Sequence, residues 1–303
     1  MPLCNLATLP LVILMHIPVL LAEVLHYLDP RPGEFMIDGT FGSGGHSAAI
    51  LEKILPGGKL LGVDWDKENI ARSNLDSQKN VLLAWGNYAD LPEILKEEKL
   101  TKADGLLLDL GFSSEQLESS GRGFSFLKDE PLLMTYDDGR KPVRDILKKI
   151  SEKELAEIIR NYGGERMAGR IAKAIVTRER QRPIATTGEL AETVRAALPK
   201  HYERGRIDRA TRTFQALRIY ANGELESLSD ILANIRAIIK PGGRAVIISF
   251  HSLEDRIVKQ AFRALQADAA AEILTKKPVV ASAEEIKINP RSRSAKLRAV
   301  KML

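Results

Sequence analysis

The stretch that decides the fold is Phe35-Met36-Ile37-Asp38-Gly39-Thr40-Phe41-Gly42-Ser43-Gly44-Gly45-His46-Ser47. A short apolar run ends in an acid, a glycine-dense loop follows, and a helical pattern begins near Ser47 and continues to Leu55. This order predicts a strand, a tight turn and a helix N-terminus, the place where a Rossmann-like sheet binds a nucleotide-bearing cofactor. Glycines let the backbone approach a ligand closely, and the helix start offers unpaired N–H groups.

Further apolar runs predict the other strands of an open α/β sheet. These strands are expected at Lys59–Val63, Val81–Ala84, Gly105–Leu108 and Arg244–Phe250. Asp64 follows the second strand and lies 20 residues beyond Gly44, the position expected of a carboxylate that binds a ribose. Asp109 follows the fourth strand, so the predicted sheet edge is rich in acids.

The rhythm of strands stops after Gly111. Helical patterns are predicted instead at 143–150, 152–162, 166–180, 187–198 and 209–222. We therefore expect an inserted, mainly helical domain at 113–222 within a sheet domain made of 16–112 and 223–303. After a helix ending near Leu265, the chain is expected to become less regular and to end in a basic tail. Residues 1–15 are expected to be an N-terminal extension, with Met15 as a sensible start.

Composition points to a soluble globular protein. The chain has 303 residues, of which 44% are hydrophobic and 28% charged, enough for a full core. The single cysteine, Cys4, excludes an intramolecular disulfide and fits a reducing, cytoplasmic compartment. The first 15 residues contain no Lys or Arg and are too short for a membrane span, so neither a secretory signal nor a membrane partner is expected.

Positive charge is concentrated in two segments. Residues 160–218 contain 14 Lys and Arg against 6 Asp and Glu, and residues 286–303 contain 6 Lys and Arg and no acid. Because the remainder is acidic overall, this distribution favours a polyanionic partner, most plausibly nucleic acid. Solvated helix faces are the alternative interpretation.

The glycine loop alone does not identify the cofactor. Its glycines do not have the Gly-x-Gly-x-x-Gly spacing typical of nicotinamide cofactors. The acids Asp38, Asp64 and Asp109 favour a cofactor with a cationic end over one with a pyrophosphate. S-Adenosylmethionine has a sulfonium, an ammonium and a ribose diol, all of which pair with acceptors, and is the predicted cofactor.

Seven stretches together resemble the RsmH (formerly MraW) family of bacterial small-subunit rRNA methyltransferases. They are HIPVLL (16–21), DGTFGSGGHS (38–47), LDLGFSSEQL (108–117), RGFSF (122–126), TRTFQALR (211–218), ISFHSLEDR (248–256) and NPRSRSAKLR (289–298). The resemblance covers residues 16 to 298 in family order. It implies an α/β fold with the Rossmann-like sheet of class I S-adenosylmethionine-dependent methyltransferases and an inserted helical domain.

The resemblance also implies an activity. The family transfers a methyl group from S-adenosylmethionine to N4 of a cytidine, position 1402 in the usual rRNA numbering, in the decoding region of 16S rRNA. The implied partner is 16S rRNA, in an assembled small ribosomal subunit; a homodimer is left open. The implied cofactor contacts are Gly44, Gly45 and His46 at the methionine part, Asp64 at the ribose, Tyr88 at the adenine, and Asp109 and Gln116.

Methyl transfer to cytosine N4 needs alignment and a hydrogen-bond acceptor for the amino group. Asp109 is the candidate acceptor, and its alternative role is a cofactor or structural hydrogen bond. Phe112 would stack on the unstacked cytosine or serve as a core or lid aromatic. His251 would orient the target or simply pack.

Basic residues are the candidates for RNA contact. They are Arg204, Arg206, Arg209 and Arg212 in the insertion and Arg291, Arg293, Lys296 and Arg298 near the C-terminus. A solvated face and a disordered tail are the respective alternatives. The five histidines are dispersed without a ligand spacing, so no metal site is predicted.

One loop departs from the family pattern. After RGFSF the family usually continues Pro-Leu-Asp-Met-Arg-Met-Asp, whereas this chain has Pro131-Leu132-Leu133-Met134-Thr135-Tyr136-Asp137. The altered stretch, Leu133 to Tyr136, motivates a second hypothesis, an RNA-binding or ribosome-assembly factor with weakened turnover that retains the cofactor pocket. A methyltransferase acting on protein or a small molecule is a third, but it leaves the basic segments unexplained.

Overall fold

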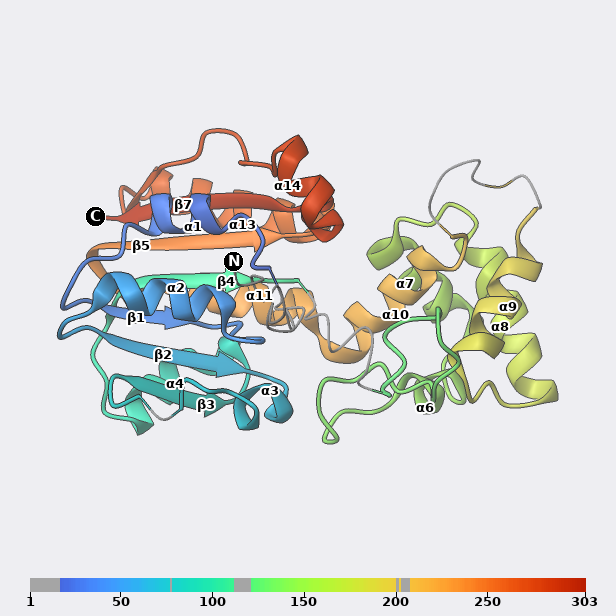
Figure 1. Cartoon of the computed structure of the whole chain (residues 1–303). Coiled ribbons are helices and arrows are strands. Elements are labelled where there is room, and N and C mark those ends of the chain that lie inside the picture. Colours follow the sequence, from blue (N-terminus) through green and yellow to red (C-terminus); the bar gives the residue numbers. More distant parts are fainter. Residues whose placement is uncertain (1–16, 77, 112–120, 200–201, 203–207) are drawn as a thin grey trace, which may run out of the picture.

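Seven strands form one sheet at the centre of the larger of two bodies (Figure 1). The computed structural model describes residues 17–76, 78–111, 121–199, 202 and 208–303. The sheet order is β3-β2-β1-β4-β5-β7-β6. The strands are β1 (Phe35–Asp38), β2 (Lys59–Asp64), β3 (Val81–Trp85), β4 (Ala103–Asp109), β5 (Ile239–Ser249), β6 (Ala271–Ile273) and β7 (Lys296–Met302). β1 to β5 pair in parallel, and β7 runs antiparallel to both β5 and β6.

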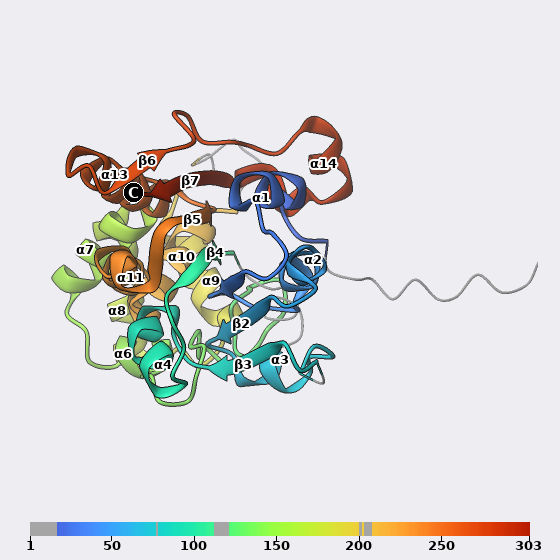
Figure 2. The ribbon, with the colours of Figure 1, turned by 90° about the vertical axis from the view of Figure 1, so that its left-hand side faces the viewer.

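Helices cover both faces of this sheet (Figure 2). Successive strand residues alternate between the two faces, so that Met36 packs with α1 and α2, whereas Ile37 packs with α4, α11 and α13. The helices of this body are α1 (Leu21–Leu28), α2 (Gly45–Ile54), α3 (Lys67–Ala71), α4 (Leu91–Glu97), α11 (Glu224–Ala233), α12 (Ile235–Ile238), α13 (Ser252–Ala267) and α14 (Ala283–Ile288). None of the described helices is long and apolar enough to cross a membrane.

The second body is helical and is inserted between β4 and α11. Its helices are α6 (Val143–Leu147), α7 (Glu152–Gly163), α8 (Ala168–Gln181), α9 (Thr187–Ala197) and α10 (Thr211–Asn222). Caps fix where they begin: Thr186 and Glu189 form a capping box at the start of α9. This body has its own apolar cluster, drawn from residues 132–221, separate from the two clusters that flank the sheet. As predicted, its described residues form no strand, only an isolated bridge between Pro131 and Thr186.

Two helix predictions were wrong in extent. The helix expected to reach Leu75 ends at Ala71, because Arg72 caps it and the Ser73 hydroxyl then accepts the Leu75 amide hydrogen. The helix expected at 225–239 is broken at Asn234 into α11 and α12, and its last residue, Ile239, already belongs to β5.

The prediction of an irregular basic tail was also wrong. Residues 296–302 form β7, which lies inside the sheet between β5 and β6. Its basic residues are therefore not all available to RNA. The Arg298 side chain is buried and donates a hydrogen bond from Nε to Asp255 Oδ1 at 2.7 Å, and Lys296 Nζ lies 3.7 Å from Asp255 Oδ2. Burial alone would raise the pKa of Asp255, but the bond and charge of Arg298 hold it below its ordinary value.

We expect Arg298→Ala to destabilise the protein rather than to weaken RNA binding specifically. Loss of the guanidinium leaves the carboxylate of Asp255 poorly compensated, which should lower the free energy of unfolding by about 1–3 kcal/mol. Urea unfolding measures this loss. The exposed neighbour Arg293 is the control, and equal stability of Arg298→Ala and Arg293→Ala would contradict the structural role.

Candidate functional site

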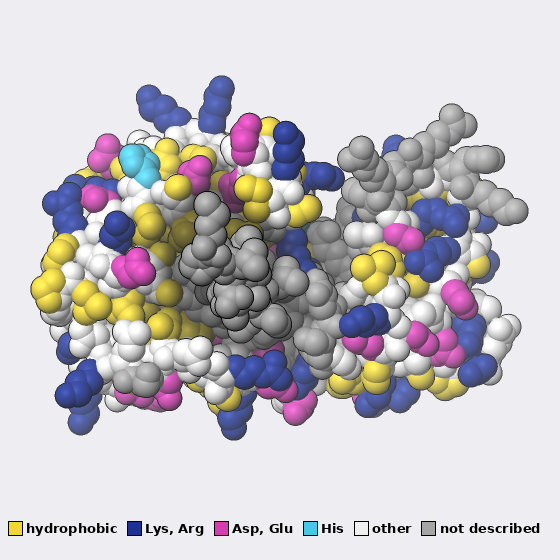
Figure 3. Space-filling model, viewed as in Figure 1, with side chains coloured by type: hydrophobic (Ala, Val, Ile, Leu, Met, Phe, Trp, Pro, Cys, Tyr) yellow, Lys and Arg dark blue, Asp and Glu magenta, His cyan; other side chains and the backbone are white. Residues whose placement is uncertain are grey.

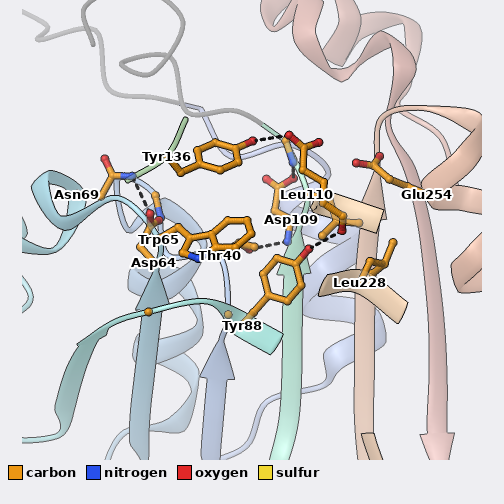
Figure 4. A pocket seen from close by; sticks show the side chains of 15 residues that line it. Thr40, Asp64, Trp65, Asn69, Tyr88, Asp109, Leu110, Tyr136, Leu228 and Glu254 are labelled. Atoms are coloured by element: carbon orange, nitrogen blue, oxygen red, sulfur yellow. Dashed lines mark hydrogen bonds between the residues drawn. The ribbon is translucent and has the colours of Figure 1, made fainter. Parts of the chain in front are cut away.

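A cavity opens where the carboxyl ends of β1, β2 and β4 meet (Figure 4). It encloses about 670 Å³ including its open mouth, a volume typical of cofactor sites. Its lining residues are Gly39, Thr40, Gly42, Asp64, Trp65, Asn69, Gly86, Tyr88, Asp109, Leu110, Gly111, Tyr136, Glu224, Leu228 and Glu254. Four of them are acids, and none of those described is Lys, Arg or His, so the cavity suits a ligand with positive charge.

The glycine loop is folded against this cavity by the buried acid Asp38. Its carboxylate accepts hydrogen bonds from the Ser47 hydroxyl at 2.7 Å and from the Thr40 amide at 3.2 Å, which ties the strand end to the loop and to α2. Gly44 caps α2 with a φ of 79°, and a Cβ there would lie 2.9 Å from Phe41 Cζ. Only glycine fits both the conformation and the space.

Asp64 ends β2 and faces the loop. Its carboxylate accepts the amide hydrogens of Gly42 at 2.6 Å and Asp66 at 2.7 Å, and a hydrogen bond from Asn69 Nδ2 at 3.2 Å. A carboxylate offers about four acceptor positions, so about one remains for a ligand hydroxyl. Burial raises the pKa of Asp64 to about 6, although these hydrogen bonds oppose the shift.

Asp109 ends β4 and lies in the same cavity. Its amide donates to Thr40 Oγ1 at 2.6 Å, and its Oδ1 accepts from the Gly111 amide at 3.3 Å. His46 donates from Nε2 to the Val19 carbonyl at 2.9 Å, so Nδ1 faces Asp109 Oδ2, at 3.8 Å. Burial raises the pKa of Asp109 to about 6, while nearby His46 and the Gly111 amide pull it down.

A second acid wall comes from α11 and the insertion. Glu224 forms a bidentate ion pair with Arg218, with both N–O distances at 2.8 Å, and accepts the Tyr136 hydroxyl hydrogen at 3.2 Å. Burial would lower the pKa of Arg218, but Glu224 outweighs burial and raises it. Burial raises the pKa of Tyr136, so its hydroxyl stays protonated and donates.

His251 and Glu254 form a capping box at the start of α13. Glu254 Oε2 accepts the amide hydrogens of Phe250 at 2.8 Å and His251 at 3.2 Å. Together with Glu224, these side chains bring possible metal-ligand atoms within 4.8 Å of one another, a grouping that the dispersed histidines of the sequence did not reveal. Both carboxylates already have partners in Arg218 and in backbone amides, so the grouping is accounted for without an ion.

The structure separates the other predicted residues. Tyr88 lines the cavity, and its hydroxyl lies 3.5 Å from the Glu224 carbonyl. Gly44, Gly45 and His46 begin α2 just behind the lining, while Phe112 and Gln116 lie outside the described residues. The predicted RNA contacts lie elsewhere: Arg212 is in α10, 3.7 Å from Glu165, and Arg291 and Arg293 are in the 3₁₀ helix Pro290–Ser294.

Several lining residues were not predicted. Trp65 directly follows the strand acid Asp64, a position that could have been proposed from the sequence. Glu254 lies in a stretch that carried the family resemblance, where only His251 was singled out. Tyr136 belongs to the altered loop, and no local pattern indicated that its ring would reach the sheet edge.

Comparison with known proteins gives the family. The model of the MraW methylase family matches residues 13–303. The chain belongs to the MraW methylase family. It is 46% identical over 310 residues to a protein named ribosomal RNA small subunit methyltransferase H from Syntrophotalea carbinolica, covering 96% of this chain and 99% of that one. Proteins of the same name from Kosmotoga olearia and Thermotoga neapolitana are 49% and 48% identical, each over 95% of this chain and 97% and 96% of theirs.

Membership of this methylase family confirms the recognised resemblance, and the sheet confirms the predicted Rossmann-like fold class. The predicted cofactor, S-adenosylmethionine, is confirmed with them. The residues present in this MraW methylase fit it, because the cavity combines acids for a cationic ligand with the aromatic side chains of Trp65, Tyr88 and Tyr136.

Replacement of Asp109 by Asn should stabilise this MraW methylase at neutral pH in the absence of ligand. The unfolded chain releases the Asp109 proton near 3.8 and the folded chain near 6, so folding is opposed as pH rises between these values. The shift corresponds to about 3 kcal/mol at pH 7, and we expect Asp109→Asn to gain roughly 1–3 kcal/mol there and little near pH 4. Urea unfolding across pH measures this. The exposed Asp268→Asn is the control, and a gain independent of pH would contradict the mechanism.

Proposed function

We propose that the protein transfers a methyl group from S-adenosylmethionine to N4 of a cytidine, position 1402 in the usual rRNA numbering, in 16S rRNA of an assembled small ribosomal subunit in the cytoplasm. The family match and the relatives named as small-subunit rRNA methyltransferases support rRNA as the substrate. The observation that carries the chemistry is Asp109, a buried acceptor at the end of β4, with one carboxylate oxygen held by the Gly111 amide.

The cofactor, when bound, supplies a methyl group on a positively charged sulfur, which is already activated towards nucleophiles. The protein therefore needs no strong base, and its residues act by binding and orientation. Asp64 would accept a ribose hydroxyl, and the loop Gly39–Gly42 would lie along the ligand. Gly111 permits a tight turn beside Asp109, because a Cβ at this position would lie 2.6 Å from the Phe250 ring.

Asp109 is proposed to accept a hydrogen bond from the cytosine amino group and then its proton. The exocyclic nitrogen of cytosine is a weak nucleophile because its lone pair is delocalised into the ring. An acceptor on the amino hydrogens lets the nitrogen pyramidalise and later lose a proton. A carboxyl with a pKa near 6 is ionised at neutral pH and still basic enough for this task.

We further propose that residues 113–222 form a substrate-recognition domain inserted into a methyltransferase domain of 16–112 and 223–303. The separate apolar cluster of the insertion and its excess of Lys and Arg support this division. On the face shown in Figure 3, Lys and Arg side chains of the insertion are interspersed with Asp and Glu. Recognition of RNA phosphates would thus come from several separated positions.

A labelling experiment tests the proposed function. Purified protein, tritiated S-adenosylmethionine and small subunits lacking the modification should give label in 16S rRNA, mapping to N4 of one cytidine. Asp109→Asn should lower the turnover rate by about 10²–10⁴-fold because the amide cannot take the proton. Asp268→Asn, far from the cavity lining, should retain full turnover. Label at a carbon or on a purine would contradict the assignment.

The altered loop supports a second function, an RNA-binding or ribosome-assembly factor with weakened turnover. Tyr136 of this loop lines the cavity, and Thr135 beside it is buried, so the loop contributes to the site itself. Cofactor binding and subunit binding with no label entering rRNA would favour that function and exclude the enzyme.

Charge reversal separates the RNA substrate from a protein or small-molecule substrate. Arg293 is exposed and Arg291 partly exposed in the short helix after Asn289. If they contact rRNA phosphates, Arg291→Glu with Arg293→Glu should weaken subunit binding by at least about tenfold, more strongly at low salt. The matched control is Lys276→Glu with Lys277→Glu. Unchanged binding and turnover in the Arg291/Arg293 variant would favour a substrate other than RNA.

A further inference from the structure

Tyr136 stands between two cavities. The first is the acid-lined cavity described above. The second adjoins it, encloses about 1190 Å³ including open solvent, and lies between the ends of β2 and β3 and the loop 122–139. Only Trp65, Gly86 and Tyr136 line both cavities among the described residues. The pair of rings is thus the partition between them.

Four contacts fix the position of Tyr136. Its ring stacks on Trp65, with centroids 5.2 Å apart and planes 21° apart, and on Phe124, with values of 5.2 Å and 27°. Its hydroxyl donates to Glu224 Oε1 at 3.2 Å, and its amide donates to Asn222 Oδ1 at 3.1 Å. The ring is therefore held by the sheet body through Trp65 and Glu224 and by the insertion through Phe124 and Asn222.

We propose that Tyr136 is a cofactor-binding residue, an aromatic surface that the insertion supplies to the adenosine end of S-adenosylmethionine. This rests on the proposed function. Trp65 follows Asp64, the expected ribose ligand, and its ring lies 6.0 Å from that of Tyr88, the expected adenine neighbour. Tyr136 extends this aromatic group across the mouth of the same cavity (Figure 4). Flat aromatic faces stack with purines and exclude water from their edges.

The chain's departure from the family pattern makes the proposal specific. The family usually has Met at the position of Tyr136, so a flexible aliphatic side chain is replaced here by a rigid ring. A smaller or flexible side chain would remove the partition and join the two cavities. Tyr136→Met tests this directly, and Tyr136→Phe keeps the ring while removing the hydroxyl that reaches Glu224.

The experiment is calorimetric titration of the full-length protein with S-adenosylhomocysteine, the demethylated cofactor. We expect Tyr136→Met to weaken binding by about tenfold and Tyr136→Phe by no more than about twofold. Phe124→Met is the matched control, because Phe124 stacks on Tyr136 but does not line the cavity, and it should change affinity by less than about threefold. Should Tyr136→Met not fold, Tyr136→His, with its smaller ring, should lose about threefold.

The outcomes separate this proposal from the function on which it rests. No binding by the wild-type protein would contradict the proposed function. Wild-type binding with unchanged affinity in Tyr136→Met overturns the role of Tyr136 alone. An equal loss in Tyr136→Met and Phe124→Met also overturns it, because the ring would then act by holding the loop and not by touching the ligand.

Discussion

The buried ion pair between Arg218 and Glu224 joins the two bodies of the molecule. Arg218 lies near the end of α10 in the insertion, and Glu224 begins α11, which packs on the sheet. Only Gly223, with a φ of 59°, separates the two helices. Because removal of either partner would leave a buried charge, the pair fixes the angle at which the insertion leaves the sheet. The same carboxylate lines the cavity and holds the Tyr136 hydroxyl, so the connection between the bodies and the shape of the site depend on one interaction.

The acids of the cavity oppose folding in the form in which they are useful. Burial raises the pKa of both Asp64 and Asp109 to about 6, which means that their ionised forms are destabilised in the empty protein. A ligand with positive charge relieves this strain, so binding and stability are linked. The neighbouring acid Asp38 has a different task, since its hydrogen bonds are all satisfied by Thr40 and Ser47 and its position organises the loop.

The sequence was informative where short-range patterns decide the structure. Continuous apolar runs predicted β1 to β4, and the acids that end β2 and β4 were placed correctly because the carboxyl ends of parallel strands share one edge. β7 was missed because Lys296, Arg298 and Lys301 interrupt its apolar pattern, and the partner that neutralises Arg298, Asp255, lies on another helix. Tyr136 and Glu224 reach the cavity through contacts between distant segments, which no local periodicity encodes. The roles of the predicted site residues stay predictions until the ligand is bound.

The position of β7 has a consequence for biosynthesis. β5 pairs in parallel with β4 on one side but waits for β7 on the other, and β6 has β7 as its neighbour in the sheet. β7 is the last strand of the chain to leave the ribosome, whereas the insertion, with its own core, is translated long before. The insertion can therefore acquire its structure during synthesis, while β5 keeps an unpaired edge until translation has nearly ended. Chaperone demand during synthesis should accordingly centre on the edge of β5.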